Sequence, residues 1–181
     1  MMQKKVQIIS DGSLDLSQEL TKEKDIEVVP FYVSFDSETY QKEMVEVGVR
    51  EFYQEMVDHP TVFPKTSMPS VHDYYEVFEK HAKEKMPVIC ICITRKFSGS
   101  LQSATTAKDM ILEEYPDAQI TVIDSTVNTV LQGLYVLEAC RLRDMGLEYQ
   151  QIVDALLPIR ETGRIFFTIG SIDYLKHGGR I

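Results

Sequence analysis

The stretch VICICITRKFSGSLQSA, residues 88–104, runs from an apolar segment through a turn containing serine and glycine into an amphipathic segment. Residues 88–94 have the composition of a buried β-strand, and the spacing of apolar residues predicts a helix from about Ser100 to Tyr115. A buried strand followed by a polar turn and a helix is the repeating unit of an α/β protein.

The same alternation of strand and helix signals continues on both sides of this stretch. The predicted strands are residues 5–10, 26–35 with an interruption at Pro30, 88–94, 118–125 and 164–171. The predicted helices are residues 48–58, 71–82 with Ser70 as N-cap, 100–115, 128–145, 148–160 and a short one within 171–179 that ends at Gly178. A further helix starts after the first strand with Ser or Asp as N-cap, residues 37–41 form the second arm of a hairpin, and residues 59–70 form a loop.

This order predicts an α/β fold with a mostly parallel sheet and helices on both faces. Its strands would be residues 5–10, 88–94, 119–124 and 165–169. In such sheets, ligands bind beyond the carboxyl ends of the strands. The polar turns that follow the strands are therefore the candidate sites.

Composition and charge exclude several classes of function. The chain has 181 residues, a net charge of −9 and a pI near 4.9, which argues against nucleic acid as a partner and mildly against anionic lipid surfaces. The apolar run near the N-terminus is too short for a secretion signal or a membrane span. An odd number of cysteines then predicts a reduced, cytoplasmic setting. Cys90 and Cys92 are interpreted as small buried residues on one strand face, and we expect no metal and no cofactor.

Hydroxyl groups are concentrated in four turns, each at or near a predicted helix start. These turns are residues 10–15, 64–70, 95–103 and 124–129. Helix N-termini offer unpaired N–H groups and a partial positive charge, and hydroxyls add donors, so converging turns of this kind suit an anion. For each residue a purely structural role is open as well: Ser13, Ser70 and Ser100 can be N-caps, and Asp11 and Asp124 can tie down turns.

The turn around Ser98 could bind one of three kinds of group. A carbonyl under nucleophilic attack would need a base and an oxyanion hole, and FSGS is not the G-x-S-x-G elbow. A phosphate loop would need one of two glycine-rich motifs, and neither occurs. A lone carboxylate needs only a few neutral donors, which fits hydroxyl-rich turns in an acidic chain.

Five motifs together resemble the DegV family along the whole chain. They are SDGSLDL (10–16), KTSMPS (65–70), FSGSLQSA (97–104), VIDST (122–126) and YLKHGGRI (174–181). The resemblance implies a protein that binds a long-chain fatty acid in a tunnel between two lobes. It also implies that some members serve a partner kinase, which phosphorylates the acid to an acyl phosphate. The protein itself would then be a binding subunit, not an enzyme.

The resemblance also implies roles for individual residues. Thr66, Ser67, Ser98 and Gly99 would surround the carboxylate, and Arg180 would lie near the head group and assist phosphoryl transfer. Behind these direct contacts we expect a supporting set of Asp11, Ser13, Ser100, Asp124 and Ser125. The alternative function is an α/β hydrolase-like enzyme with Ser98 as nucleophile.

The sequence departs from the family pattern in three places. Gly12 replaces a hydroxyl residue that is usual in the first turn, and the turn after Asp124 is bulkier than usual. Family members also continue past GGRI into a second lobe. We therefore interpret residues 1–181 as a DegV-like N-terminal α/β domain truncated before that lobe. Such a chain would expose an apolar face, bind fatty acid weakly by itself and self-associate.

Overall fold

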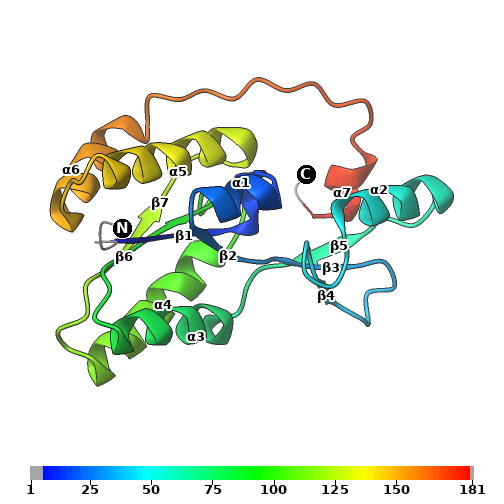
Figure 1. Ribbon diagram of the computed structural model, residues 1–181. Helices are drawn as coiled ribbons and strands as arrows, with labels where there is room; N and C mark the ends of the chain where they lie inside the picture. The colour runs from blue at the N-terminus through cyan, green and yellow to red at the C-terminus, as the bar shows by residue number, and fades with distance from the viewer. Residues whose placement is uncertain (1–5, 180–181) are drawn as a thin grey trace. The chain divides into compact units, whose positions relative to one another are not determined.

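The computed structural model describes residues 6–179, which fall into two compact units. The first unit lies within Met1–Val29 and Pro69–Ile165, and the second within Pro30–Met68 and Phe166–Ile181. We refer to them as the parallel unit and the antiparallel unit. Figure 1 shows their helices and strands with the labels used below.

The parallel unit is built on a four-stranded parallel sheet in the order β2-β1-β6-β7. Its strands are β1 (Gln7–Asp11), β2 (Ile26–Val29), β6 (Val88–Cys92) and β7 (Ile120–Asp124). Strand β1 lies at the centre, with Ile8 opposite Ile26 on one side and Ile89 on the other. The short apolar runs form strands here because both faces of the sheet are covered, so continuous apolar residues are buried rather than exposed.

Helices cover both faces of this sheet, as Figure 1 shows. Successive strand residues point to opposite faces, so Ile89 and Ile91 pack in one core with α5 and α6, whereas Cys90 and Cys92 pack in the other with α3 and α4. The helices of the unit are η1 (Gly12–Leu14), α1 (Gln18–Glu23), α3 (Val71–Lys83), α4 (Ser100–Glu114), α5 (Thr129–Asp144) and α6 (Tyr149–Ile159). The predicted fold class, a mostly parallel sheet with helices on both faces, is confirmed.

Capping explains where two of these helices begin. Ser70 accepts a hydrogen bond from the amide of Asp73, and the Asp73 carboxylate accepts one from the Ser70 amide, so α3 starts with a reciprocal capping box as predicted. After β1, the chain first forms the short turn η1, and α1 begins only at Gln18 with Ser17 as its cap.

A charged cluster attaches α3 to the edge strand β2. Glu27 accepts hydrogen bonds from His81 Nε2 at 2.6 Å and from Lys80 Nζ at 3.1 Å. Burial alone would raise the pKa of Glu27, but the hydrogen bonds from His81 and Lys80 outweigh it and the pKa is lowered. A carboxylate with a lowered pKa stabilises the fold above its unfolded pKa, and that contribution is lost as the pH falls through the folded pKa.

We therefore expect the Glu27→Gln variant to lose less stability than the wild-type chain on acidification from about pH 6 to about pH 3. Urea unfolding across this range measures the difference. Glu113→Gln, at an exposed position on α4, is the control and should follow the wild-type curve. Parallel curves for the wild-type chain and Glu27→Gln would contradict this assignment.

The antiparallel unit contains a three-stranded sheet in the order β4-β3-β5. Its elements are β3 (Tyr32–Ser34), β4 (Gln41–Lys42), α2 (Val49–Asp58), β5 (Lys65–Ser67) and α7 (Asp173–His177). Phe52 of α2 packs against Phe35 with ring centroids 5.2 Å apart, and the Phe63 ring stacks on His177 of α7 at 3.7 Å. Aromatic contacts thus attach both helices to this unit.

Two sequence predictions are wrong in this region. Residues 164–171 form no strand, and Phe166 and Phe167 are 93% and 72% exposed. The fourth strand of the parallel sheet is β2 instead, which pairs with β1. Aromatic and β-branched composition favours a strand only where a partner strand is available, and the described residues offer none to this segment. The expected self-association of the exposed residues stays a prediction.

The second error concerns residues 59–70, which were predicted as a loop but contain β5. This strand pairs antiparallel with β3, with Thr66 opposite Val33 and Ser67 opposite Tyr32. The prolines at 60, 64 and 69 flank the strand rather than interrupt it, so they do not prevent ladder hydrogen bonds.

No helix within residues 6–179 has the length and apolar character needed to cross a membrane.

Candidate functional site

Three turns meet at the carboxyl edge of the parallel sheet. The amide of Ser125 donates to the carbonyl of Cys92 at 3.0 Å, and the amide of Thr94 donates to the carbonyl of Val127 at 3.0 Å. The turns that follow β6 and β7 are therefore tied together by backbone hydrogen bonds. The turn that follows β1 joins them through Asp11, the last residue of that strand.

Asp11 is fully buried, and its carboxylate accepts hydrogen bonds from residues far along the chain as well as from the nearby backbone amide of Ser13. The amide of Ile93 and the hydroxyl of Ser100 both donate to Oδ2, at 2.9 and 2.7 Å. Oδ1 accepts from Gln132 Nε2 at 2.8 Å. Because Ile93 and Ser100 are the two ends of the turn between β6 and α4, a single carboxylate oxygen closes that turn. We call residues 93–100 the β6–α4 turn.

The Asp11 carboxyl has no cation among the neighbours that the structure describes. Burial raises its pKa, while the hydrogen bonds from Ser100, Ile93 and Gln132 oppose that rise. Tyr74 of α3 extends the network, since its hydroxyl lies 2.6 Å from Ser100 Oγ. Burial, with Cys92 and Asp11 nearby, raises the pKa of Tyr74 well above its usual value, so the phenol remains a donor.

The hydroxyl of Ser98 has a defined role within this turn. Its oxygen accepts a hydrogen bond from the amide of Ser100 at 3.2 Å, and the side chain is half-buried. With the oxygen engaged as an acceptor, the hydroxyl hydrogen remains available to an external acceptor. Gly99 is the N-cap residue of α4 and provides no side-chain cap. The turn can thus present one hydroxyl donor beside the positive end of a helix.

Asp124 and Ser125 stabilise their own turn. Asp124 accepts from the amide of Thr126 at 2.8 Å, and its other oxygen lies 3.8 Å from Arg95 Nε. The Ser125 hydroxyl donates to the carbonyl of Val127 at 2.9 Å. Ser13 lies in η1 and is half-buried. These contacts match the structural role considered for Asp124, and the supporting roles of Ser13 and Ser125 at a ligand site stay predictions.

Thr66 and Ser67 lie on β5 of the antiparallel unit, where both side chains are exposed. Ser98, Gly99, Asp11, Ser100, Asp124 and Ser125 belong to the parallel unit. Arg180 lies outside the described residues. The structure thus brings the parallel-unit residues to one sheet edge, and the assignment of Thr66, Ser67 and Arg180 to the same site stays a prediction.

Comparison with known proteins identifies the family. The model of the DegV family, which is described as uncharacterised, matches residues 5–181. The chain belongs to the DegV family. A DegV domain-containing protein of Clostridium perfringens is 31% identical over 176 residues, which are 97% of this chain and 61% of that protein. The chain thus spans about 61% of the length of the curated relatives it matches.

Solved DegV structures share the fold. A stearic acid-binding protein from Eubacterium ventriosum is 48% identical with a TM-score of 0.92, and the match covers 97% of this chain and 60% of that one. A DegV family protein from Thermus thermophilus, described by its fatty acid binding, is 29% identical with a TM-score of 0.80 and the same coverage.

Two members of the network were missed by the sequence analysis. Tyr74 lies within the predicted helix of residues 71–82, and its ring packs in the core. Gln132 lies within the predicted helix of residues 128–145, most of whose residues before Arg141 are apolar. A single amide in such a segment is a signal for a buried polar contact, because an apolar environment penalises an amide without hydrogen bonds.

The interpretation of the cysteines is confirmed: Cys90 and Cys92 are buried, with sulfurs 3.7 Å apart on one strand face.

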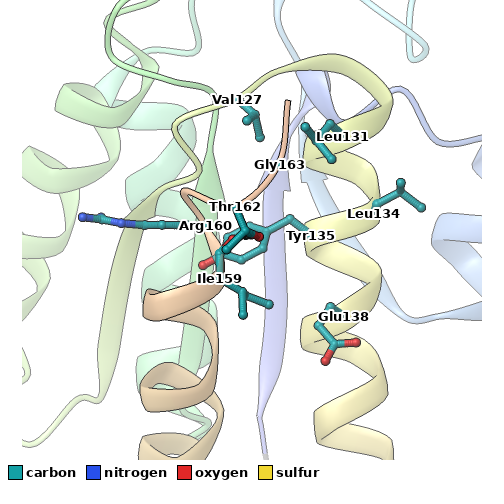
Figure 2. Close-up of a pocket in the computed structure, with 9 residues that line it drawn as sticks. All are labelled: Val127, Leu131, Leu134, Tyr135, Glu138, Ile159, Arg160, Thr162 and Gly163. Carbon is teal, nitrogen blue, oxygen red and sulfur yellow. Dashed lines mark hydrogen bonds between the residues drawn. The ribbon is translucent and has the colours of Figure 1, made fainter. Parts of the chain in front are cut away.

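A pocket of about 160 Å³ lies between α5 and the end of α6 (Figure 2). Leu131 and Leu134 of α5 and Ile159 of α6 supply apolar walls, and the Tyr135 ring lies between the two helices, whereas the Arg160 side chain extends away. Val127, whose carbonyl binds the amide of Thr94, also lines it. The pocket therefore borders the strand-end turns of this DegV protein.

Within residues 6–179, no cluster of His, Cys, Asp and Glu is suited to a metal ion.

Proposed function

We propose that this DegV protein binds a long-chain fatty acid and holds its carboxylate with Thr66, Ser67, Ser98 and the backbone at Gly99. The observation that carries the proposal is the geometry of Ser98, whose oxygen already accepts the amide of Ser100. The hydroxyl hydrogen therefore remains free to be donated, and a carboxylate is an acceptor without donors. The stearic acid bound by the Eubacterium ventriosum relative supports this class of ligand.

We further propose that the protein presents the bound acid to a separate kinase and does not itself catalyse the reaction. Arg180 would then stabilise the charge of the acyl phosphate that forms. The carboxylate oxygen would attack the terminal phosphorus of a nucleoside triphosphate, and the bond from that phosphorus to the bridging oxygen would break with the nucleoside diphosphate as leaving group. On this proposal, Arg180→Ala retains acid binding but slows acyl phosphate formation when kinase and ATP are supplied.

The alternative hypothesis, Ser98 as a nucleophile, gains no support from the parallel unit. Its two histidines lie on α3, where His72 pairs with Glu76 and His81 pairs with Glu27. The hydrogen bond that the structure gives Ser98 comes from a backbone amide, not from a base. Labelling by a serine-reactive fluorophosphonate would favour the alternative.

Binding of stearic acid to the full-length gene product tests the proposed function. We expect Ser98→Ala and Thr66→Val each to weaken binding by about tenfold, since each removes a hydrogen bond to a charged group. Isothermal titration with stearic acid gives the affinities. Mass spectrometry of an organic extract of the purified protein identifies any acid that is retained from the host cell.

The matched control is Ser17→Ala, which also removes a hydroxyl at a helix start. Ser17 caps α1 by accepting the amide of Leu20, so its loss lowers stability by about 1 kcal/mol without changing stearic acid affinity. Equal affinities for the wild-type protein, Ser98→Ala and Thr66→Val would show that these residues do not bind the carboxylate.

A further inference from the structure

Gln132 occupies a fully buried position on α5 and makes two hydrogen bonds with its amide nitrogen. Nε2 donates to Asp11 Oδ1 at 2.8 Å and to Ser10 Oγ at 3.1 Å. The Ser10 hydroxyl donates its hydrogen to the carbonyl oxygen of Ile91 at 2.9 Å, so Ser10 can only accept a hydrogen bond from Gln132. Both neighbours therefore require a donor, and the amide is fixed with nitrogen toward Asp11.

The amide oxygen of Gln132 has no hydrogen-bond partner in the described part of the chain. Rotation of the side-chain amide would bring this oxygen against the Asp11 carboxylate, where two acceptors would repel each other. Gln132 thus fixes the rotation of Asp11, with Oδ1 held by α5 and Oδ2 directed to the β6–α4 turn.

The second half of the network has a defined direction as well. Ser100 donates its hydroxyl hydrogen to Asp11, so the Tyr74 hydroxyl must be the donor in its 2.6 Å contact with Ser100. The Ser100 amide in turn donates to Ser98 Oγ. Each step from Gln132 to Ser98 is therefore a hydrogen bond between a fixed donor and a fixed acceptor.

We propose that Gln132 is a positioning residue for the ligand site: through Asp11 and Ser100 it holds the β6–α4 turn in the form that directs the Ser98 hydroxyl to a bound acid. This inference rests on the proposed function. A buried carboxylate without a cation lowers stability relative to an apolar contact. A role of Asp11 in shaping the β6–α4 turn would explain why the carboxylate is nevertheless present.

The test combines hydrogen exchange with stearic acid binding in the full-length Gln132→Leu variant. Leucine has a similar volume but no donor. We expect amide exchange to accelerate at least tenfold within residues 93–100 and stearic acid to bind at least fivefold more weakly. Exchange within β6 and β7 should stay at wild-type rates, which separates a local loss of position from general destabilisation.

Gln150→Leu is the matched control, since Gln150 also donates to an aspartate, Asp154, but on the exposed face of α6. It should change neither exchange in the β6–α4 turn nor affinity. Asp11→Asn should accelerate exchange and weaken affinity less than Gln132→Leu does, because its oxygen can still accept from Ile93 and Ser100, although a Gln132 rotated toward the new amide would place its oxygen against Ser10. Asp11→Asn combined with Gln132→Leu should change both at least as much as Gln132→Leu alone.

The outcomes distinguish the two proposals. If the wild-type protein binds no stearic acid, the proposed function fails, while exchange in Gln132→Leu still decides whether Gln132 positions the turn. Wild-type exchange rates within residues 93–100 of Gln132→Leu would overturn the inference. If that variant does not fold, Gln132→Met keeps the length of the side chain but removes the donor to Asp11, and unchanged exchange within residues 93–100 would overturn the inference equally.

Discussion

Replacement of Gly133 by alanine is expected to destabilise the protein by about 3 kcal/mol. A Cβ atom at this position would lie 2.4 Å from the carbonyl oxygen of Leu14 and 2.8 Å from Cδ2 of Leu16. The Leu14 oxygen belongs to the backbone of η1, so it cannot move aside as the end of a flexible side chain can. Helix α5 would have to shift away from the first turn of the chain.

The displacement of α5 would also reach the proposed ligand site, because Gln132 is the preceding residue and holds Asp11. We therefore expect Gly133→Ala to lower both the midpoint of urea unfolding and the affinity for stearic acid. Gly170→Ala is the control, since open space surrounds that position, and it should stay within about 0.5 kcal/mol of the wild-type protein. Equal midpoints for both variants would show that η1 and α5 do not pack as described.

Truncation of Phe78 to alanine is expected to cost about 3 to 5 kcal/mol. Phe78 is fully buried on α3, within the core between α3, α4 and the sheet. Its ring centroid lies 5.8 Å from that of Tyr74. Removal of the ring leaves a cavity and takes away the neighbour that supports the Tyr74 ring, so the contact between Tyr74 and Ser100 should weaken too.

Chemical denaturation followed by circular dichroism measures this loss. Phe167→Ala makes the same substitution at a residue that is 72% exposed, and it should change the free energy of unfolding by less than about 0.5 kcal/mol. A loss below about 1 kcal/mol for Phe78→Ala would mean that the core beneath α3 is not closely packed.

The strands of the parallel sheet that are buried on both faces were predictable from the sequence. Residues 88–94 and 118–125 are apolar runs bounded by turn signals, and β6 and β7 lie within them. Residues 164–171 have a similar composition and form no strand. Composition reports the fit of a residue to a sheet, whereas strand formation also needs a partner backbone, which a local pattern does not contain.

The site was predictable in part. The turns at Asp11, Ser98 and Ser125 were located because parallel strands place their carboxyl ends at one edge. The order of the contacts was not predictable. Asp11 was expected to tie down its own turn, and it does accept the amide of Ser13, but its carboxylate also closes a turn more than 80 residues later. Such pairings depend on packing between distant elements, as does the role of Gln132.

The sequence separation of these contacts has a consequence for synthesis on the ribosome. Asp11 bonds to Ile93, Ser100 and Gln132, which follow it by 82, 89 and 121 residues. Strand β1 can pair early with β2, but its other edge stays open until β6 emerges. Pairing over such distances is slow, and an open strand edge invites contact with other chains. The nascent chain therefore carries one open edge of β1 until residues 88–92 have emerged, and chaperones that bind extended apolar segments have their longest opportunity there.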